Sequence, residues 1–451
     1  MKPHGFPRLT LVDDSPLSQL LGLREMNEEF TRARRLAPLL EPFYLRYTVT
    51  NQVNGRHCLV NGRSVVHFGS GNYLGLEQHR EVLYAAKRAV DELGTDSGCP
   101  RIVSSQANVL ELENAIGQLL GADGVMVGNN TFQLHGETIP GLFGFEDAVL
   151  FVDRFAEAGM QAAASAAVAK GARIVRVDVS DPPGLRKILA REKARAGALL
   201  VDGVYAVHGH TPDLSLLSDL CRNFGIVLYV DDSHGVGVLG ARGGGAAEAS
   251  GVEFENLIVV ASLQNAFGSY GAFVSGRAAL IELLRLTSKA SAMGGTLQPS
   301  AVEGALAAVR ISRSPEGATL RRQLADRSRR VRVQLQALGF VVASGESPIL
   351  TITIGRDLKT LMAGRKLFDT GVFVPAVLAA EFSQYSQHSQ GRGLLRIALT
   401  TLHTEEDLEK LISGFRELRH YLPKHENPLR QAAHLAYEVG RAKLQGAGFR
   451  L

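Results

Sequence analysis

Six short runs of apolar residues, separated by stretches rich in Ala and Leu, constrain the fold of this chain more than any other feature. Several runs are apolar without interruption, which is typical of central strands covered by helices on both faces. Strands that alternate with helices over about 150 residues predict a doubly wound, mostly parallel α/β sheet. The predicted strands are GVMV (124–127), AVLFVD (148–153), RIVRV (173–177), ALLVDGV (198–204), IVLYVDD (226–232) and LIVVASL (257–263).

The chain as a whole divides into four predicted parts. Its 451 residues correspond to two or three domains at about 150 residues each. Residues 1–58 form an N-terminal arm with a helix, and residues 59–300 form a large α/β domain of cofactor-binding type. Residues 301–422 form a smaller α+β domain. Residues 423–451 contain another predicted helix, which is either a solvated tail or a contact to a partner.

The smaller domain has its own pattern. One long helix, SAVEGALAAVRISRS followed by the Arg-rich ATLRRQLADRSRRVRVQLQALG, leads into it. The runs ILTITIG and GLLRIALTTL predict two strands, and EEDLEKLISGFRELRHYL predicts a closing helix.

Composition excludes several classes of protein. An apolar content of 45% and a charged content of 21% are ordinary for a soluble enzyme. The net charge of +4 is small, and basic residues do not cluster with aromatic ones, so we expect no nucleic-acid partner. Three widely spaced cysteines without a CxxC pair predict neither disulfides nor a metal site. With no signal peptide and no apolar run of about 18 residues, we expect no membrane span and a cytoplasmic location.

The stretch VDDSHGVGVLGARGGG (230–245) carries the strongest chemical signal. A buried strand ends in Asp231, and His234 follows in a Gly-rich turn, where ligands of open α/β sheets bind. A carboxylate at that place can keep a buried pyridinium nitrogen protonated, which turns a pyridoxal ring into an electron sink. The next strand ends in ASLQNAFGSYGAFVSG (261–276), where such chemistry needs a lysine.

Together these motifs resemble the α-oxoamine synthases, such as aminooxononanoate synthase and serine palmitoyltransferase. The family has aminotransferase fold type I and joins an acyl-CoA to an amino acid with loss of carbon dioxide. The resemblance covers about residues 60–420 and implies pyridoxal phosphate and a dimer. Its landmarks are GNYLGL (71–76), CPR (99–101), VDGVYAVHG (201–209), VDDSHGVGVLG (230–240), SLQNAFGSYGAF (262–273), GTLQPS (295–300) and GLLRIALTTLHT (393–404).

The resemblance assigns roles to individual residues. Asp231 would face the pyridine nitrogen, and His234 would lie beside the ring hydroxyl. Ser262 would meet the phosphate, which Thr296 would reach from the partner subunit. Arg396 would hold the amino-acid carboxylate, for which a bidentate guanidinium is well shaped.

Three departures from the family pattern concern the reacting groups. Asn265 stands at the lysine position, and an amide cannot form the imine of the usual mechanism. Glu157 replaces a histidine that stacks on the ring, so it is either a new general base or a polar residue at the pocket rim. Gly71, beside Asn72 in the substrate pocket, replaces an asparagine.

Further departures lie around the same pocket. Asn129 and Asn130 replace a Gly-aromatic pair at the phosphate turn. His208 replaces an acidic residue, and Gly244 replaces an arginine. So many changes around one pocket favour natural divergence over a single engineered exchange of the lysine. If Asn265 were engineered, the parent activity would be the ordinary synthase reaction.

Cys99 and the turn that carries Asp231 and His234 each allow two interpretations. Cys99 is either an inert buried thiol or a nucleophile that takes an acyl group from a thioester, with His208, His210 or His234 as base. Asp231 and His234 either still face a ligand or only stabilise their turn.

Three functions therefore stay open. The first is an acyltransferase that uses an acyl-CoA or acyl-carrier thioester and an amino acid or amine, with pyridoxal phosphate absent or bound without a covalent link. The second is an inactive subunit that pairs with a lysine-bearing paralogue, as the non-catalytic long-chain-base subunit of serine palmitoyltransferase does. The third is a binding module for a small anionic ligand. The persistence of Arg396 favours the first. The partner is a second copy of the chain or the lysine-bearing paralogue.

Overall fold

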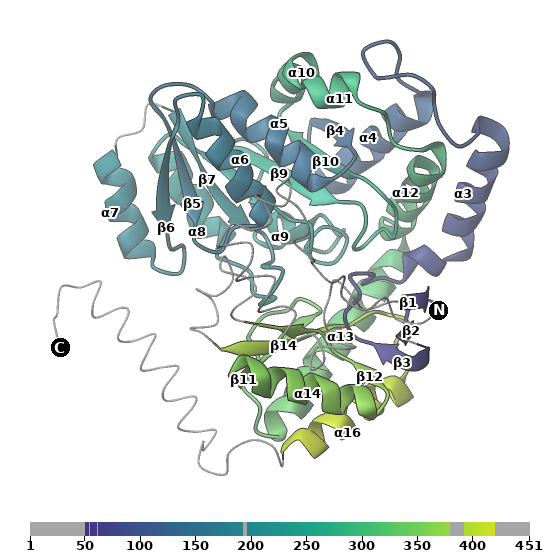
Figure 1. Ribbon diagram of the computed structural model, residues 1–451. Helices are drawn as coiled ribbons and strands as arrows, with labels where there is room; N and C mark the ends of the chain where they lie inside the picture. The colour runs from purple at the N-terminus through teal and green to yellow at the C-terminus, as the bar shows by residue number, and fades with distance from the viewer. Residues whose placement is uncertain (1–49, 54, 61, 193–195, 379–391, 420–451) are drawn as a thin grey trace, which may run out of the picture.

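A seven-stranded sheet forms the centre of the larger part of the molecule (Figure 1). The computed structural model describes residues 50–53, 55–60, 62–192, 196–378 and 392–419. The strand order is β4-β10-β9-β8-β7-β5-β6, in which β10 is antiparallel to both neighbours and the other pairs are parallel. The strands are β4 (Gly124–Gly128), β5 (Ala148–Asp153), β6 (Arg173–Val177), β7 (Ala196–Asp202), β8 (Val227–Asp231), β9 (Leu257–Ser262) and β10 (Ala272–Gly276).

Helices cover both faces of this sheet. Successive side chains of β5 enter different buried clusters, since Val149 and Phe151 belong to one and Leu150 and Val152 to the other. This is the burial that a doubly wound sheet requires, and the predicted fold class is confirmed. The helices of this part are α3 (Arg80–Leu93), α4 (Ala107–Leu120), α5 (Thr131–Phe143), α6 (Ala158–Val168), α7 (Pro182–Glu192), α8 (Leu214–Asn223), α9 (Gly245–Ala249), α10 (Ala278–Thr287), α11 (Lys289–Met293) and α12 (Pro299–Ser312), with a short 3₁₀ helix η1 (Leu76–Gln78).

The C-terminal part carries a second sheet of order β11-β14-β13. A further sheet, β1-β2-β3-β12, joins the start of the described chain to this part, because β12 pairs in parallel with β3. The elements are β1 (Thr50–Val53), β2 (His57–Val60), β3 (Arg63–His67), α13 (Pro315–Ala337), β11 (Ile349–Gly355), α14 (Asp357–Asp369), β12 (Val372–Phe373), β13 (Ala376–Val377), β14 (Gly393–Ala398) and α16 (Glu405–Leu418).

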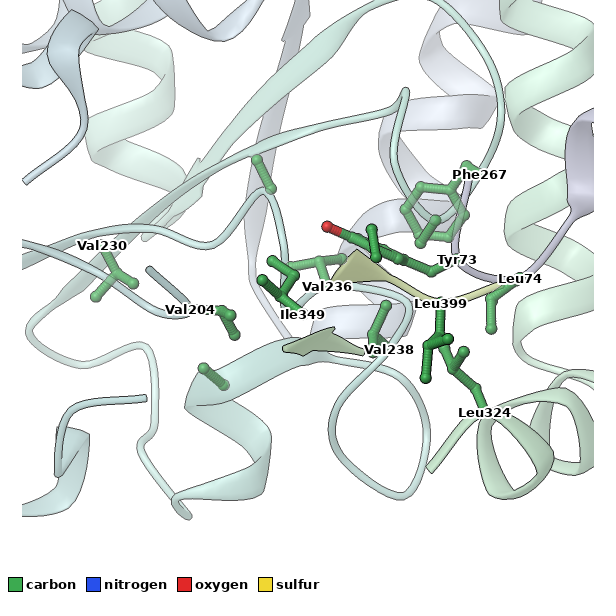
Figure 2. Packing of buried hydrophobic residues seen from close by; sticks show 14 of the residues in the cluster. Tyr73, Leu74, Val204, Val230, Val236, Val238, Phe267, Leu324, Ile349 and Leu399 are labelled. Carbon is green, nitrogen blue, oxygen red and sulfur yellow. The ribbon is translucent and has the colours of Figure 1, made fainter. Parts of the chain in front are cut away.

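The larger and C-terminal parts share one hydrophobic core. Leu74, Leu324 and Leu399 are all buried members of the same cluster, although they come from distant segments of the chain. Figure 2 shows these three side chains close together, with Ile349 and Tyr73 nearby. Because the core is continuous, residues of β14 are held in a fixed place beside the carboxyl ends of the central strands.

The six predicted strands of the large sheet are all present, with ends shifted by at most two residues. The prediction of one long helix over residues 300–339 is wrong, because α12 ends at Ser312 and α13 begins at Pro315. Ser314 separates them, since its side chain accepts a hydrogen bond from Gly317 N and Pro315 suits the first helical position. The antiparallel strand β10 and the strands β1 to β3 were not predicted.

Other predictions are not tested. The helices predicted over residues 17–40 and 423–451 lie outside the described residues. The domain boundaries stay predictions. Among the helices that are described, none combines the length and the apolar character that a membrane crossing needs.

Candidate functional site

The carboxyl ends of β7, β8 and β9 lie side by side and supply the centre of the site. Asp202 at the end of β7 is in register with Asp231 at the end of β8, and Ser262 ends β9. Side chains that end neighbouring parallel strands meet at one edge of a sheet, where ligands of open α/β folds bind. Asp231 and Ser262 thus lie at the edge that the sequence indicated.

Asp231 is already paired within the protein. Its Oδ2 lies 2.7 Å from Nε2 of His135, and its Oδ1 accepts a hydrogen bond of 2.9 Å from Ser233 N. His135, on α5, places its other ring nitrogen 2.9 Å from the hydroxyl of Tyr229. Burial by itself would raise the pKa of Asp231, but the hydrogen bond and charge of His135 outweigh it and lower that pKa.

His135 is the main residue of the site that the sequence did not indicate. It is fully buried, and Asp231 is only 4% exposed. It lies in the middle of a helix, 96 positions before its carboxylate partner, so no local motif marks it. The usable signal is its position on the buried side of α5, with Leu134, Thr138 and Ile139, where an unpaired imidazole would be costly.

Glu157 stands at the start of α6. Its side chain accepts hydrogen bonds from the first backbone N–H groups of that helix, Gly159 N and Met160 N, and its own N donates to Asp202 Oδ1 at 2.8 Å. Burial and the charge of Asp231 raise the pKa of Glu157. The same two causes, in the same order, raise the pKa of Asp202 well above its ordinary value. The site therefore gathers more carboxyl groups than it can ionise together.

Three of these side chains could hold a cation. His135, Glu157 and Asp231 each offer one ligand atom, and the three atoms lie within 4.8 Å of one another. They are, however, already engaged with protein groups, because His135 is hydrogen-bonded to Asp231 and Glu157 caps α6. Their geometry is explained without a metal ion.

Asn265 lies in the turn after β9 and points back at the turn after β8. Its Nδ2 donates to Ser233 O at 2.8 Å and lies 3.3 Å from Nδ1 of His234. A Cβ placed on Gly71 would be only 2.6 Å from Asn265 Oδ1. The absence of a side chain at position 71 therefore leaves the room that the amide of Asn265 occupies. Tyr73 N donates to Asn265 O at 3.2 Å and ties the two segments together.

His234 and Arg396 form the other side of the site. Nδ1 of His234 lies 2.7 Å from the hydroxyl of Tyr73. Burial, followed by the charge of Arg396, lowers the pKa of His234 to about 4, so its imidazole is neutral at pH 7. Arg396, on β14, donates from Nε to Ala206 O at 2.6 Å, which fixes the guanidinium in the site.

The residues predicted to meet a phosphate make short polar contacts of their own. Ser262 Oγ accepts from Gln264 N at 3.0 Å, and Asn130 caps α5 by accepting from Gln133 N at 2.8 Å. Asn129 Nδ2 donates to Gly295 O at 3.1 Å, next to Thr296. Their phosphate contacts stay predictions.

Thr296 and Cys99 belong to one group of contacts within this chain. The hydroxyl of Ser97 lies 2.5 Å from Thr296 Oγ1 and also donates to Cys99 O at 3.3 Å. Asn72 lies near Gly71 and donates from its backbone N to Ser70 Oγ at 3.2 Å. The structure thus relates Cys99 to Thr296, whereas the predicted acyl nucleophile needs a histidine beside it.

Two of the histidines predicted as bases, His208 and His210, lie beside each other. Their ring centroids are 6.1 Å apart, and His210 stacks on Tyr205. Burial lowers the pKa of both histidines to about 4, and for His208 the charge of His210 adds to it. Their predicted role toward Cys99 stays a prediction.

Comparison with known proteins identifies the class. The family of class I and II aminotransferases matches residues 63–415, so the chain belongs to that family. Among its curated relatives, 8-amino-7-oxononanoate synthase of Geobacter metallireducens is 34% identical over 80% of this chain and 90% of the relative. The corresponding protein of Geobacter sulfurreducens is 32% identical over 81% and 91%. These relatives are α-oxoamine synthases, as the sequence motifs indicated.

Solved structures define the fold as that of fold type I. Serine palmitoyltransferase of Sphingomonas wittichii has a TM-score of 0.80 at 24% identity, with 90% of this chain and 100% of that chain covered. A serine palmitoyltransferase with a pyridoxal phosphate internal aldimine also has a TM-score of 0.80, at 23% identity over 90% and 99%. At this identity the likeness concerns the fold.

The residues present do not fit a pyridoxal phosphate held in that way. An internal aldimine requires a lysine amine, yet the sequence contains no lysine between Lys193 and Lys289, a stretch that includes the turns after β8 and β9. The carboxylate at the end of β8 is also paired with His135 and is nearly inaccessible.

Proposed function

We propose that this chain is an acyltransferase-type homologue of the α-oxoamine synthases that works without a lysine-linked pyridoxal phosphate. Its substrates would be an acyl thioester, from CoA or a carrier protein, and an amino acid or amine. Asn265 takes the lysine position of the family in this proposal. Curated relatives that use an acyl substrate and an amino acid support the substrate class.

The single observation that carries the proposal is the fixed guanidinium of Arg396. Its Nε is held by Ala206 O at 2.6 Å, the Tyr73 hydroxyl accepts a further hydrogen bond from the guanidinium, and a guanidinium carries five N–H donors in all. A planar, fixed guanidinium suits a carboxylate with two parallel hydrogen bonds. The neutral His234 lies near enough for Arg396 to lower its pKa, so a base and a carboxylate-binding group lie near each other.

In this proposal no lysine-linked cofactor serves as an electron sink, and this restricts the reaction. Joining the acyl group to carbon requires a stabilised carbanion, which protein side chains alone supply poorly. The acceptor atom is therefore the amine nitrogen. The N–C bond forms as the C–S bond of the thioester breaks, and His234 takes the amine proton and passes it to the leaving thiolate. The products are an amide and a free thiol.

Thiol release from a series of acyl-CoA donors, with amino acids as acceptors, tests this proposal. We expect release that depends on the acceptor. Arg396→Gln should raise the KM for the amino acid about 10-fold or more, since a charged hydrogen bond contributes about 1.5–3 kcal/mol. Arg310, an exposed arginine on α12 paired with Glu111, is the control, and Arg310→Gln should leave the KM unchanged. If no donor, CoA- or carrier-linked, gives release from the purified chain, the proposal is wrong.

A second function is favoured by the way Asn265 is bound. Its amide is held by Ser233 O and lies beside His234, so the turn is stable without a cofactor. Such a chain could complete the site of a lysine-bearing paralogue in a heterodimer. Co-purification with that paralogue, and activity only in the mixture, would support it. A homodimer with activity of its own would contradict it.

A further inference from the structure

His135 is a buried histidine in a place where the fold gives it an acidic partner. The imidazole is fully buried, Nε2 lies 2.7 Å from Asp231, and Nδ1 lies 2.9 Å from the Tyr229 hydroxyl. Both ring nitrogens are thus satisfied inside the protein. Such a ring is held in place by the protein and has no ring nitrogen left to bind a ligand.

A pyridinium ring would need the same carboxylate. To pair with Asp231, the ring must lie against this residue and donate a hydrogen bond from its N–H group to a carboxylate oxygen. Only 4% of Asp231 is exposed, and both of its oxygens are already hydrogen-bonded, one to His135 and the other to Ser233 N. A pyridine ring can therefore reach Asp231 only if the His135 ring leaves its place.

The charges lead to the same point. Asp202 and Glu157 lie close enough to Asp231 for its charge to raise the pKa of both. A cationic or hydrogen-bond-donating ring beside Asp231 offsets the repulsion among these three carboxyl groups, whether the ring belongs to a cofactor or to the protein. His135 supplies that ring from the chain itself, with the hydrogen-bond geometry of a charge-assisted pair.

We infer that the imidazole of His135 takes the place of the cofactor's pyridine ring on Asp231, so that two separate residues, His135 and Asn265, exclude pyridoxal phosphate. Restoring a lysine at position 265 is then insufficient, and the His135 ring must be removed as well. The inference concerns the site of the proposed function, but it holds whether or not the chain transfers acyl groups.

Binding of pyridoxal phosphate to four proteins tests this inference. They are the unchanged chain, Asn265→Lys, His135→Ala with Asn265→Lys, and His79→Ala with Asn265→Lys. His79 is the matched control because it also faces a carboxylate, Glu316 at 3.2 Å, but at a partly exposed position outside the site. Bound cofactor is measured after dialysis. Its attachment to Lys Nζ, an imine formed with loss of water, is reduced with borohydride and located by mass spectrometry.

We expect the His135→Ala, Asn265→Lys protein to retain at least tenfold more pyridoxal phosphate than each of the other three. Equal retention by Asn265→Lys alone would overturn the inference, as would stoichiometric retention by the unchanged chain. A folded double variant that retains no cofactor would also overturn it, since His135 would then not be the obstacle. Thermal unfolding establishes that each variant is folded, and His135→Asn replaces the alanine variant if that one is not.

Discussion

Gly71 and Asn265 form a pair whose coupling can be measured. Substituting Gly71→Ala places a Cβ 2.6 Å from Asn265 Oδ1 and 3.3 Å from its Cγ. Non-bonded heavy atoms prefer separations of about 3.5–4.0 Å, so the amide must move by roughly 1 Å. That movement disturbs the hydrogen bond from Asn265 Nδ2 to Ser233 O, now 2.8 Å long.

The cost follows from the hydrogen bond. Losing it and leaving a partly buried carbonyl without its donor costs about 1–3 kcal/mol. Replacing glycine with alanine restricts the unfolded chain and returns about 0.4–1 kcal/mol. We therefore expect Gly71→Ala to lower the free energy of unfolding by about 1–2 kcal/mol. In an Asn265→Ala background the clash is absent, because position 265 then ends at Cβ, and the same substitution should be neutral or slightly stabilising.

Urea unfolding of the four proteins of this double-mutant cycle measures the coupling, which we expect to be about 1–3 kcal/mol. Gly136→Ala is the control, since Gly136 lies on α5 with no atom within 4 Å of its added Cβ. That change should stabilise the protein by up to about 1 kcal/mol. If Gly71→Ala is equally costly in both backgrounds, the amide of Asn265 does not occupy the room that Gly71 leaves.

Three further predictions concern the framework, each measured by urea unfolding. Glu113→Ala should cost about 3–5 kcal/mol, because this carboxylate is buried between two arginines, whereas Glu111→Ala on the exposed side of α4 should cost less than about 1 kcal/mol. Thr404→Ala should cost about 1 kcal/mol through loss of the capping box with Asp407. Burial lowers the pKa of His403 from its ordinary 6.5 to about 4. Between these two values the unfolded chain binds one more proton than the folded chain, so the free energy of unfolding decreases as the pH is lowered from about 6.5 to about 4. His403→Gln should flatten that slope by up to about 1.4 kcal/mol per pH unit, and an unchanged slope would contradict the assignment.

The strands of the large sheet could be predicted because each carries its signal locally. Runs such as AVLFVD are apolar on both sides, and that pattern arises only where helices cover two faces. The direction of β10 could not be predicted, since AFVSG looks the same in a parallel and an antiparallel strand. The break at Ser314 could have been found from the Ser-Pro pair, which ends one helix and starts the next.

The site shows the same division between local and distant signals. The position of Asp231 could be predicted because it ends a buried strand, and that of Asn265 because it follows the next strand in a recognisable motif. His135 could not, since its partner lies on another element and nothing near it in the sequence is acidic except Glu137. A single sequence gives the ends of strands, but it does not say which helix side chain reaches them.

Sheet topology explains why a residue such as His135 matters. β5, β7 and β8 are parallel neighbours that all end in aspartate, so Asp153, Asp202 and Asp231 are brought to one edge. Asp153 is satisfied by Tyr205 and by backbone N–H groups, which leaves Asp231 as the carboxylate that keeps a lowered pKa. A fold that keeps this acidic edge needs a donor ring against Asp231 whenever no cofactor supplies one. His135 meets that need from within the chain, and a site completed in this way can hold an asparagine at position 265 without losing the stability of the edge.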